Sequence, residues 1–155
     1  MYIVDRNSLL PQYCIWRTLK LVRVIFGEKG AGNSKRIIQM ANDSLDQTKG
    51  SVVFIDAEGQ YLFELKHAIR FIDAGHYRIN NPDMFLGFIA GIAAQDFDLE
   101  LVFVDGFTKL VNCGTESLED MFKRLDELTT EAGIQVVIAM SGDDIPDYLN
   151  KYMAE

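Results

Sequence analysis

The sequence predicts an α/β fold: a three-layer domain in which a mostly parallel sheet of about five strands lies between helices on both faces. Short apolar, β-branched runs alternate along the chain with amphipathic helical stretches, and such alternation produces parallel sheets. Glycines or acids follow several of these runs, as at the ends of buried strands. The 155 residues, 48% hydrophobic and 25% charged, suit one globular domain.

Each element has its own local signal. The strands are expected over 21–26, 51–55, 68–72 (an edge strand), 99–104 and 134–140, with a short helix or loop over 59–66. The first helix is expected to begin near Ser34. Asn81 and Pro82 form a typical helix start, with an Asn cap and Pro at the first position. The sequence 117–120, SLED, resembles a capping box, and a last helix is expected over 145–153.

Residues 21–155 contain no linker or repeat and are expected to form a single domain. Residues 1–20 are an N-terminal extension of uncertain status: either an element beside the first strand or the product of an upstream start codon. No apolar run approaches the ~20 residues of a membrane span, and the N-terminus lacks the pattern of a signal peptide. Cys14 and Cys113 show no pairing or metal spacing, so we expect a cytoplasmic protein.

The charge distribution favours a small anionic ligand. The net charge is −8, which makes nucleic acid an unlikely partner. Residues 1–50 hold eight Lys or Arg against four Asp or Glu, a net +4, so the rest of the chain carries −12. The basic part surrounds a glycine-rich segment.

That segment, GEKGAGNS over residues 27–34, directly follows the first strand and precedes the first helix. It matches the phosphate-loop pattern G-x-x-x-x-G-K-[ST] at both glycines and at the hydroxyl residue, the usual Mg²⁺ ligand. Glycines let backbone N–H groups surround a phosphate, and the helix N-terminus adds partial positive charge. The alternative is a glycine-rich turn without a ligand. The residues expected to bind the cofactor are Gly27, Gly30, Gly32, Asn33, Ser34 and Lys35.

Asn33 stands where the pattern has the lysine that reaches the β- and γ-phosphates. An amide can hydrogen-bond to phosphate but brings no charge. The missing contact is expected to cost ~1.5–3 kcal/mol, which weakens binding roughly ten- to a hundredfold and harms catalysis more. Lys29, inside the loop, and Lys35, after Ser34, do not occupy the lysine position.

Acidic residues follow two of the strands. The run LVFVD, ending at Asp105, has the form of the second phosphate-site signature (Walker B), whose aspartate holds Mg²⁺; alternatively, Asp105 caps the turn before Gly106. Glu58, just beyond the second strand, could orient or deprotonate an attacking water, or be an exposed turn residue. Asp56 lies where a dinucleotide-binding unit has its ribose-binding acid, but Lys35 breaks the required glycine pattern.

Taken in order, the loop, Ile55-Asp56-Ala57-Glu58 and the strand ending at Asp105 resemble the ATPase core of the RecA-like P-loop superfamily, from about residue 21 to 141. The resemblance implies that the strand at 134–140 lies between the loop strand and the Walker B strand, and that Glu58 corresponds to the catalytic glutamate. The chain is also similar to small uncharacterised bacterial proteins with generic ATP-binding or twitching-motility labels. Those generally retain lysine at the position of Asn33.

The first functional hypothesis is binding of ATP and Mg²⁺ with weak or absent hydrolysis. Ser34 and Asp105 would hold Mg²⁺, and Glu58 would be the vestigial catalytic base. The second is a pseudo-NTPase that binds an unknown protein partner without nucleotide. The third is a dinucleotide-binding enzyme.

Overall fold

The computed structural model describes residues 20–154. Its strands all run parallel, in the spatial order β1-β5-β4-β2-β3. The predicted five-stranded parallel sheet is thus confirmed, and β5 lies between β1 and β4, as the RecA-like resemblance implies. The strands are β1 (Val22–Gly27), β2 (Ser51–Asp56), β3 (Ile69–Asp73), β4 (Leu99–Asp105) and β5 (Gln135–Ser141).

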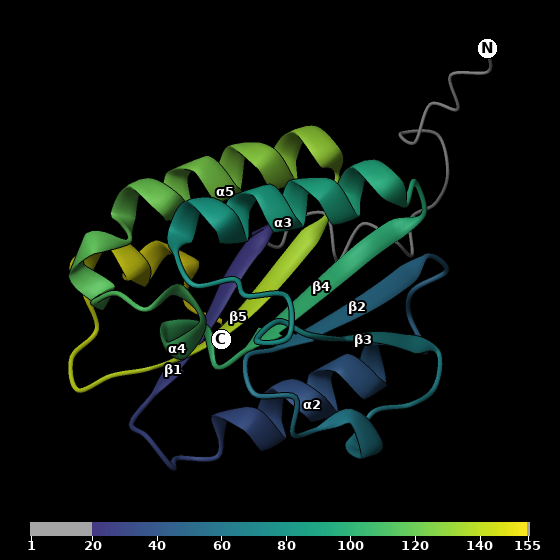
Figure 1. Cartoon of the computed structure of the whole chain (residues 1–155), viewed down its shortest axis with the longest axis horizontal. Helices are drawn as coiled ribbons and strands as arrows, with labels where there is room; N and C mark the ends of the chain where they lie inside the picture. The colour runs from purple at the N-terminus through teal and green to yellow at the C-terminus, as the bar shows by residue number, and fades with distance from the viewer. Residues whose placement is uncertain (1–19, 155) are drawn as a thin grey trace.

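Helices cover both faces of the sheet, so its apolar strands are buried on each side. The α-helices are α2 (Asn33–Ser44), α3 (Pro82–Gln95), α4 (Phe107–Val111) and α5 (Glu119–Ala132). Residues 20–154 also contain three short 3₁₀ helices: η1 (Leu62–Glu64), η2 (Thr115–Ser117) and η3 (Asp147–Tyr152). Figure 1 shows α3 and α5 side by side on one face of the sheet and α2 on the other.

The core therefore has two parts. On one face, Ile37 and Ala41 of α2 pack against apolar side chains of the sheet. On the other face, aromatic rings join the helices: the Phe85 and Phe107 ring centroids lie 5.0 Å apart, and those of Phe107 and Phe122 lie 6.1 Å apart. Since Phe107 belongs to α4, this cluster anchors a helix that begins next to Asp105.

The two edges of the sheet differ. β3 pairs with β2 alone among the described strands, which confirms it as an edge strand. Along β1, the Ala154 N–H donates to the Val24 carbonyl at 2.9 Å, and Met153 forms a parallel bridge with Val24. The C-terminal segment therefore covers part of the β1 edge. The extension expected at residues 1–20 lies outside the described residues, except for Lys20.

One of the two expected helix caps is confirmed. The Asn81 side chain accepts a hydrogen bond from the Met84 N–H at 2.9 Å, with Pro82 at the first helical position. The expected capping box is wrong, because the Ser117 hydroxyl donates to the Gly114 carbonyl within a 3₁₀ turn. Leu118, which precedes α5, is fully buried, so packing positions this start.

Two further segments differ from expectation. The sequence predicts only a turn after Asp105, but the chain forms α4 there. The helix expected over 145–153 is shorter and of 3₁₀ type, as η3. No helix within residues 20–154 is long and apolar enough to cross a membrane.

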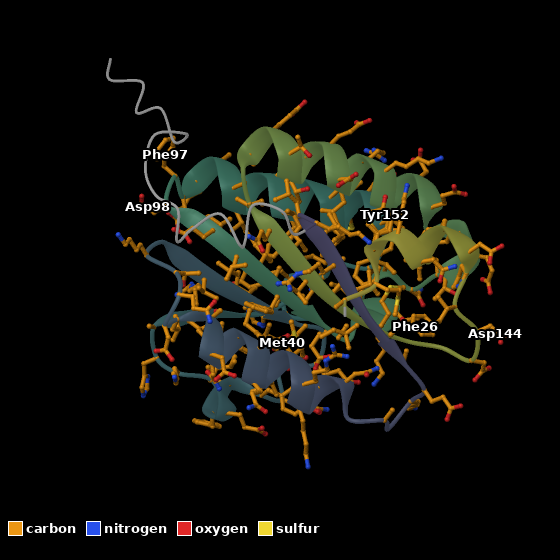
Figure 2. All side chains as sticks on the ribbon, turned by 180° about the vertical axis from the view of Figure 1, so that it is seen from behind. Phe26, Met40, Phe97, Asp98, Asp144 and Tyr152 are labelled. Atoms are coloured by element: carbon orange, nitrogen blue, oxygen red, sulfur yellow. The ribbon has the colours of Figure 1, made fainter. Side chains whose placement is uncertain are left out.

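All strands point the same way, so their carboxyl ends gather at one edge of the molecule. Figure 2 shows Phe26 and Asp144 at this carboxyl edge and Phe97 and Asp98 at the opposite edge. Ligands of open parallel α/β sheets bind beyond the carboxyl ends of the strands. The glycine-rich loop, Asp56 and Asp105 all lie there.

Candidate functional site

The glycine-rich loop connects the end of β1 to the start of α2. Gly30 and Gly32 both have φ of 87°, a left-handed conformation that favours glycine. Gly32 is the residue that precedes α2, and no side chain caps this helix start. Space within 4 Å of a Cβ at Gly30 or Gly32 is empty of protein. The uncapped N–H groups of the first turn remain available for an anion.

Asn33 is turned towards the sheet. Its Nδ2 donates to the Met140 carbonyl of β5 at 3.2 Å. A Cβ at Gly27 would lie 2.9 Å from Asn33 Oδ1, so Gly27 gives the amide the room it occupies. Through this hydrogen bond, Asn33 joins the first turn of α2 to β5.

Ser34 connects the loop to β4, the strand with the Walker B pattern. Its hydroxyl donates a hydrogen bond to the Asp105 carboxylate at the end of β4. The bond spans β5, which separates β1 from β4 in the sheet. The structure thus brings together the two residues that the sequence assigns to Mg²⁺.

Asp105 is 5% exposed, so its carboxylate is buried. Burial raises the pKa of Asp105, and hydrogen bonds from Ser34 and the Gly106 N–H lower this pKa in part. The nearby charges of Asp56 and Glu58 raise the pKa further. A buried carboxylate that the fold disfavours in its charged form is common at functional sites.

Asp56 has a different role from Asp105, although the two are paired residues of adjacent strands. Its carboxylate accepts hydrogen bonds from the N–H groups of Glu58 (3.0 Å), Gln60 (2.8 Å) and Tyr61 (3.3 Å). It is 3% exposed. Both oxygens therefore hold the turn after β2, which argues against Asp56 as a ribose ligand.

Glu58 lies at the same edge but is already paired. Its Oε1 is 2.6 Å from the Lys109 Nζ, and its Oε2 accepts from the Gln60 Nε2 at 2.9 Å. The Glu58 side chain is 44% exposed and that of Lys109 is 56% exposed. The hydrogen bond with Glu58 raises the pKa of Lys109, and the charge of Asp105 adds to the effect.

Sequence reasoning missed Lys109. The residues FTKLV after Gly106 place apolar side chains at 107, 110 and 111, the i, i+3, i+4 spacing of a helix face. All three are buried, and Lys109 is the exposed residue between them. This spacing could have identified both α4 and its lysine.

The remaining expected ligand, Lys35, lies on the exposed surface of the first turn of α2. Within residues 20–154 no group of three or more His, Cys, Asp or Glu could hold a metal ion. A Ser and an Asp suit Mg²⁺ nonetheless, because this ion is usually held by one or two protein oxygens together with substrate phosphates and water. The donor set therefore fits Mg²⁺ that arrives with a nucleotide.

A separate hollow of about 570 Å³ lies between α3 and the β2–β3 side of the sheet. It shares none of the residues discussed above. Its lining includes Val53, Ile72 and Phe88, together with Arg70 of the edge strand.

The sheet order, the loop between β1 and α2 and the Ser34–Asp105 contact define the fold class as a P-loop NTPase-like α/β domain of the RecA-like type. Among solved structures, the chain is similar to the flagellar accessory protein FlaH from Methanocaldococcus jannaschii. The TM-score is 0.58 at 13% identity, covering 90% of this chain and 71% of FlaH.

The chain is also similar to PCH-2 of C. elegans, with a TM-score of 0.52 at 11% identity. That match covers 88% of this chain and 34% of PCH-2, so the chain spans about a third of PCH-2. At such identities the likeness establishes the fold alone. No protein-family profile and no curated protein matches the chain.

Proposed function

We propose that this chain is a cytoplasmic nucleotide-binding domain that holds Mg·ATP at the carboxyl edge of its sheet, with weak or absent hydrolysis. The observation that carries the proposal is the hydrogen bond between Ser34 and Asp105. It joins the phosphate-type loop to the end of β4, the strand with the Walker B pattern. Two oxygens poised together are what a Mg²⁺ ion needs from the protein when phosphates supply its other ligands.

In this proposal each loop residue has a defined task. Backbone N–H groups from Gly27 to Ser34 surround the phosphates, helped by the partial positive charge of the α2 N-terminus. Lys35, in the first turn, adds positive charge from the surface. Mg²⁺, when bound with the nucleotide, neutralises phosphate charge, and Ser34 and Asp105 are its protein ligands.

Weak hydrolysis follows from two features. Asn33 brings no charge and already donates to the Met140 carbonyl. Glu58, the expected base, is ion-paired with Lys109 and hydrogen-bonded to Gln60. A carboxylate with both oxygens engaged is poorly placed to accept a proton from water.

The test is calorimetric titration with Mg·ATP on wild type, on Asn33→Lys and on a matched control, Gln39→Lys. Gln39 is an exposed residue of the same helix, so the control adds the same charge about 9 Å further along the axis. We expect submillimolar binding by wild type, binding about ten- to a hundredfold tighter by Asn33→Lys, and no comparable gain for the control. Equal gains in both variants would indicate a general charge effect.

A second function, a protein-interaction domain without nucleotide, is favoured by the outer edge of β3, which pairs with no strand within residues 20–154, and by the strongly exposed Phe63, at 95%. An unpaired strand edge can accept a strand of another chain. This alternative stands if wild type binds no nucleotide at millimolar concentration while Asn33→Lys does. If neither binds, the phosphate-loop interpretation itself is wrong. Titration with NAD tests the dinucleotide-binding hypothesis.

A further inference from the structure

The candidate site lacks a lysine at the position that normally meets the terminal phosphates. Asn33 occupies that position and its amide is engaged with Met140 of β5. A nucleoside triphosphate carries concentrated negative charge, and the carboxylates of Asp56, Glu58 and Asp105 add further negative charge at the same edge. A site of this kind therefore needs a cation from elsewhere in the fold.

α4 is held firmly at this edge. Phe107, Leu110 and Val111 anchor it in the core, with exposed fractions of 0%, 3% and 1%. Gly106, with φ of 68°, begins the helix so close to β2 that an added Cβ would lie 2.9 Å from the Ala57 Cβ.

Further along α4, the Thr108 hydroxyl donates to the Ser141 carbonyl at the end of β5, at 3.3 Å. This contact joins α4 to β5, which lies beside β1 in the sheet. The position of the neighbouring lysine is thus set by contacts on both sides of β4.

Lys109 leaves this fixed helix towards solvent and reaches Glu58, at 2.6 Å. Both side chains are about half exposed. Ion pairs at such exposure contribute little to the stability of a protein, since water and salt screen them. A lysine on a flexible four-carbon stem can therefore exchange this carboxylate for a more highly charged phosphate at little cost.

We propose that Lys109 supplies the missing positive charge: when nucleotide binds, its ammonium leaves Glu58 and contacts the terminal phosphate, in place of a loop lysine. This inference rests on the proposed function, because it concerns the same nucleotide. The exchange has a second consequence, since it releases Glu58 from its ion pair only when a terminal phosphate is present.

The experiment compares Mg·ATP and Mg·ADP titrations of wild type, Lys109→Ala and Lys123→Ala. Lys123 is the matched control, because it is equally exposed and also ion-paired, to Glu119 at 3.4 Å. We expect Lys109→Ala to lose about ten- to a hundredfold in ATP affinity, a much smaller factor for ADP, and Lys123→Ala to match wild type. Adding Asn33→Lys to Lys109→Ala should restore ATP binding.

Glu58→Gln separates a ligand role from a structural one. If Lys109 served only to pair with Glu58, both variants would change ATP affinity alike. Under the proposal they differ: Glu58→Gln frees the lysine, so its ATP affinity is equal to or above that of wild type, whereas Lys109→Ala loses affinity. Unfolding midpoints of the two variants should lie close together, since each removes the same exposed pair.

The outcomes are distinguishable. Wild type that binds no nucleotide overturns the proposed function and this inference with it. Wild type that binds ATP while Lys109→Ala binds equally well overturns the inference alone. The same holds if Lys29→Ala or Lys35→Ala loses ATP affinity and Lys109→Ala does not, because the loop region would then supply the charge.

Discussion

Asp56 and Asp105 end adjacent strands in register, yet only Asp105 accepts a hydrogen bond from Ser34 of the glycine-rich loop. We predict that replacing Asp56 lowers stability and that replacing Asp105 lowers nucleotide binding. Asp56→Ala removes the acceptor of three backbone N–H groups, those of Glu58, Gln60 and Tyr61, at 3.0, 2.8 and 3.3 Å.

The magnitude follows from these three bonds. A hydrogen bond to a charged group contributes ~1.5–3 kcal/mol, but contributions of neighbouring groups do not add fully. Glu58 and Gln60 are exposed, so water can replace part of what their N–H groups lose. We therefore expect Asp56→Ala to lower the free energy of unfolding by ~3 kcal/mol, a large share of the ~5–15 kcal/mol typical of a domain. Asp56→Asn keeps one acceptor oxygen and should cost ~1–2 kcal/mol.

Urea unfolding measures these differences, with Asp143→Ala as the control for loss of an exposed acid beyond a strand end. The Asn variant, which is expected to stay folded, is then titrated with Mg·ATP and should bind as wild type does. The reasoning is refuted if Asp56→Asn keeps full stability but loses nucleotide or NAD binding. Asp56 would then be a ligand-binding acid, as in the dinucleotide-binding hypothesis.

Three further predictions follow from single contacts. Burial raises the pKa of Asp105, so the folded protein binds a proton on this carboxylate more tightly than the unfolded chain does. The stability of wild type therefore falls as pH rises above the ordinary pKa of 3.8. In urea unfolding, Asp105→Asn should be more stable than wild type from pH 4 to pH 7, and it should lose Mg²⁺-dependent ATP binding. Gly106→Ala places a Cβ 2.9 Å from the Ala57 Cβ at a φ of 68° and should cost ~1–3 kcal/mol, measured by thermal unfolding; an unchanged midpoint would contradict the close approach of α4. The Tyr148 hydroxyl donates to the Thr115 carbonyl, and burial raises the pKa of Tyr148 to about 12. Tyr148→Phe should therefore lower the free energy of unfolding by ~1 kcal/mol at pH 7. This difference should shrink as pH rises from 10 towards 12, because only wild type then loses stability through ionisation of the tyrosine in the unfolded chain.

The sequence predicts the sheet well because parallel strands buried on both faces leave unbroken apolar runs. The loop strand, the acids at the strand ends and the Asn81 cap are all local signals, and the structure places them where they are expected. The edge position of β3 is also predicted, by its alternating pattern.

Other features depend on packing that no local pattern reports. Ser117 has the residue type and spacing of a capping box, but burial of Leu118 fixes the start of α5 differently. α4 is only five residues long, so its apolar i, i+3, i+4 spacing covers little more than one turn and is a weak signal beside the packing of its core partners. Its anchor, Phe107, meets Phe85 and Phe122 only after the chain has folded.

The candidate site also combines features predicted by local sequence signals with contacts that form only on folding. The predictions for Gly27, Ser34 and Asp105 come from spacing, since a phosphate loop and a strand-end acid are short motifs. The partners of Glu58 and Asn33 come from distant parts of the chain: Lys109 is 51 residues from Glu58, and Met140 is 107 residues from Asn33. Contacts of such separation cannot be read from one sequence.

Residue-specific NMR titration of the wild-type chain with Mg²⁺ and a non-hydrolysable ATP analogue tests the central claim most directly. We predict backbone amide shifts concentrated from Gly27 to Ser34 and at Asp105 and Gly106, with none beyond background in the hollow between α3 and β3. The account is contradicted if saturating nucleotide leaves the loop amides unmoved, or if the shifts gather at Arg70 and Phe88 instead.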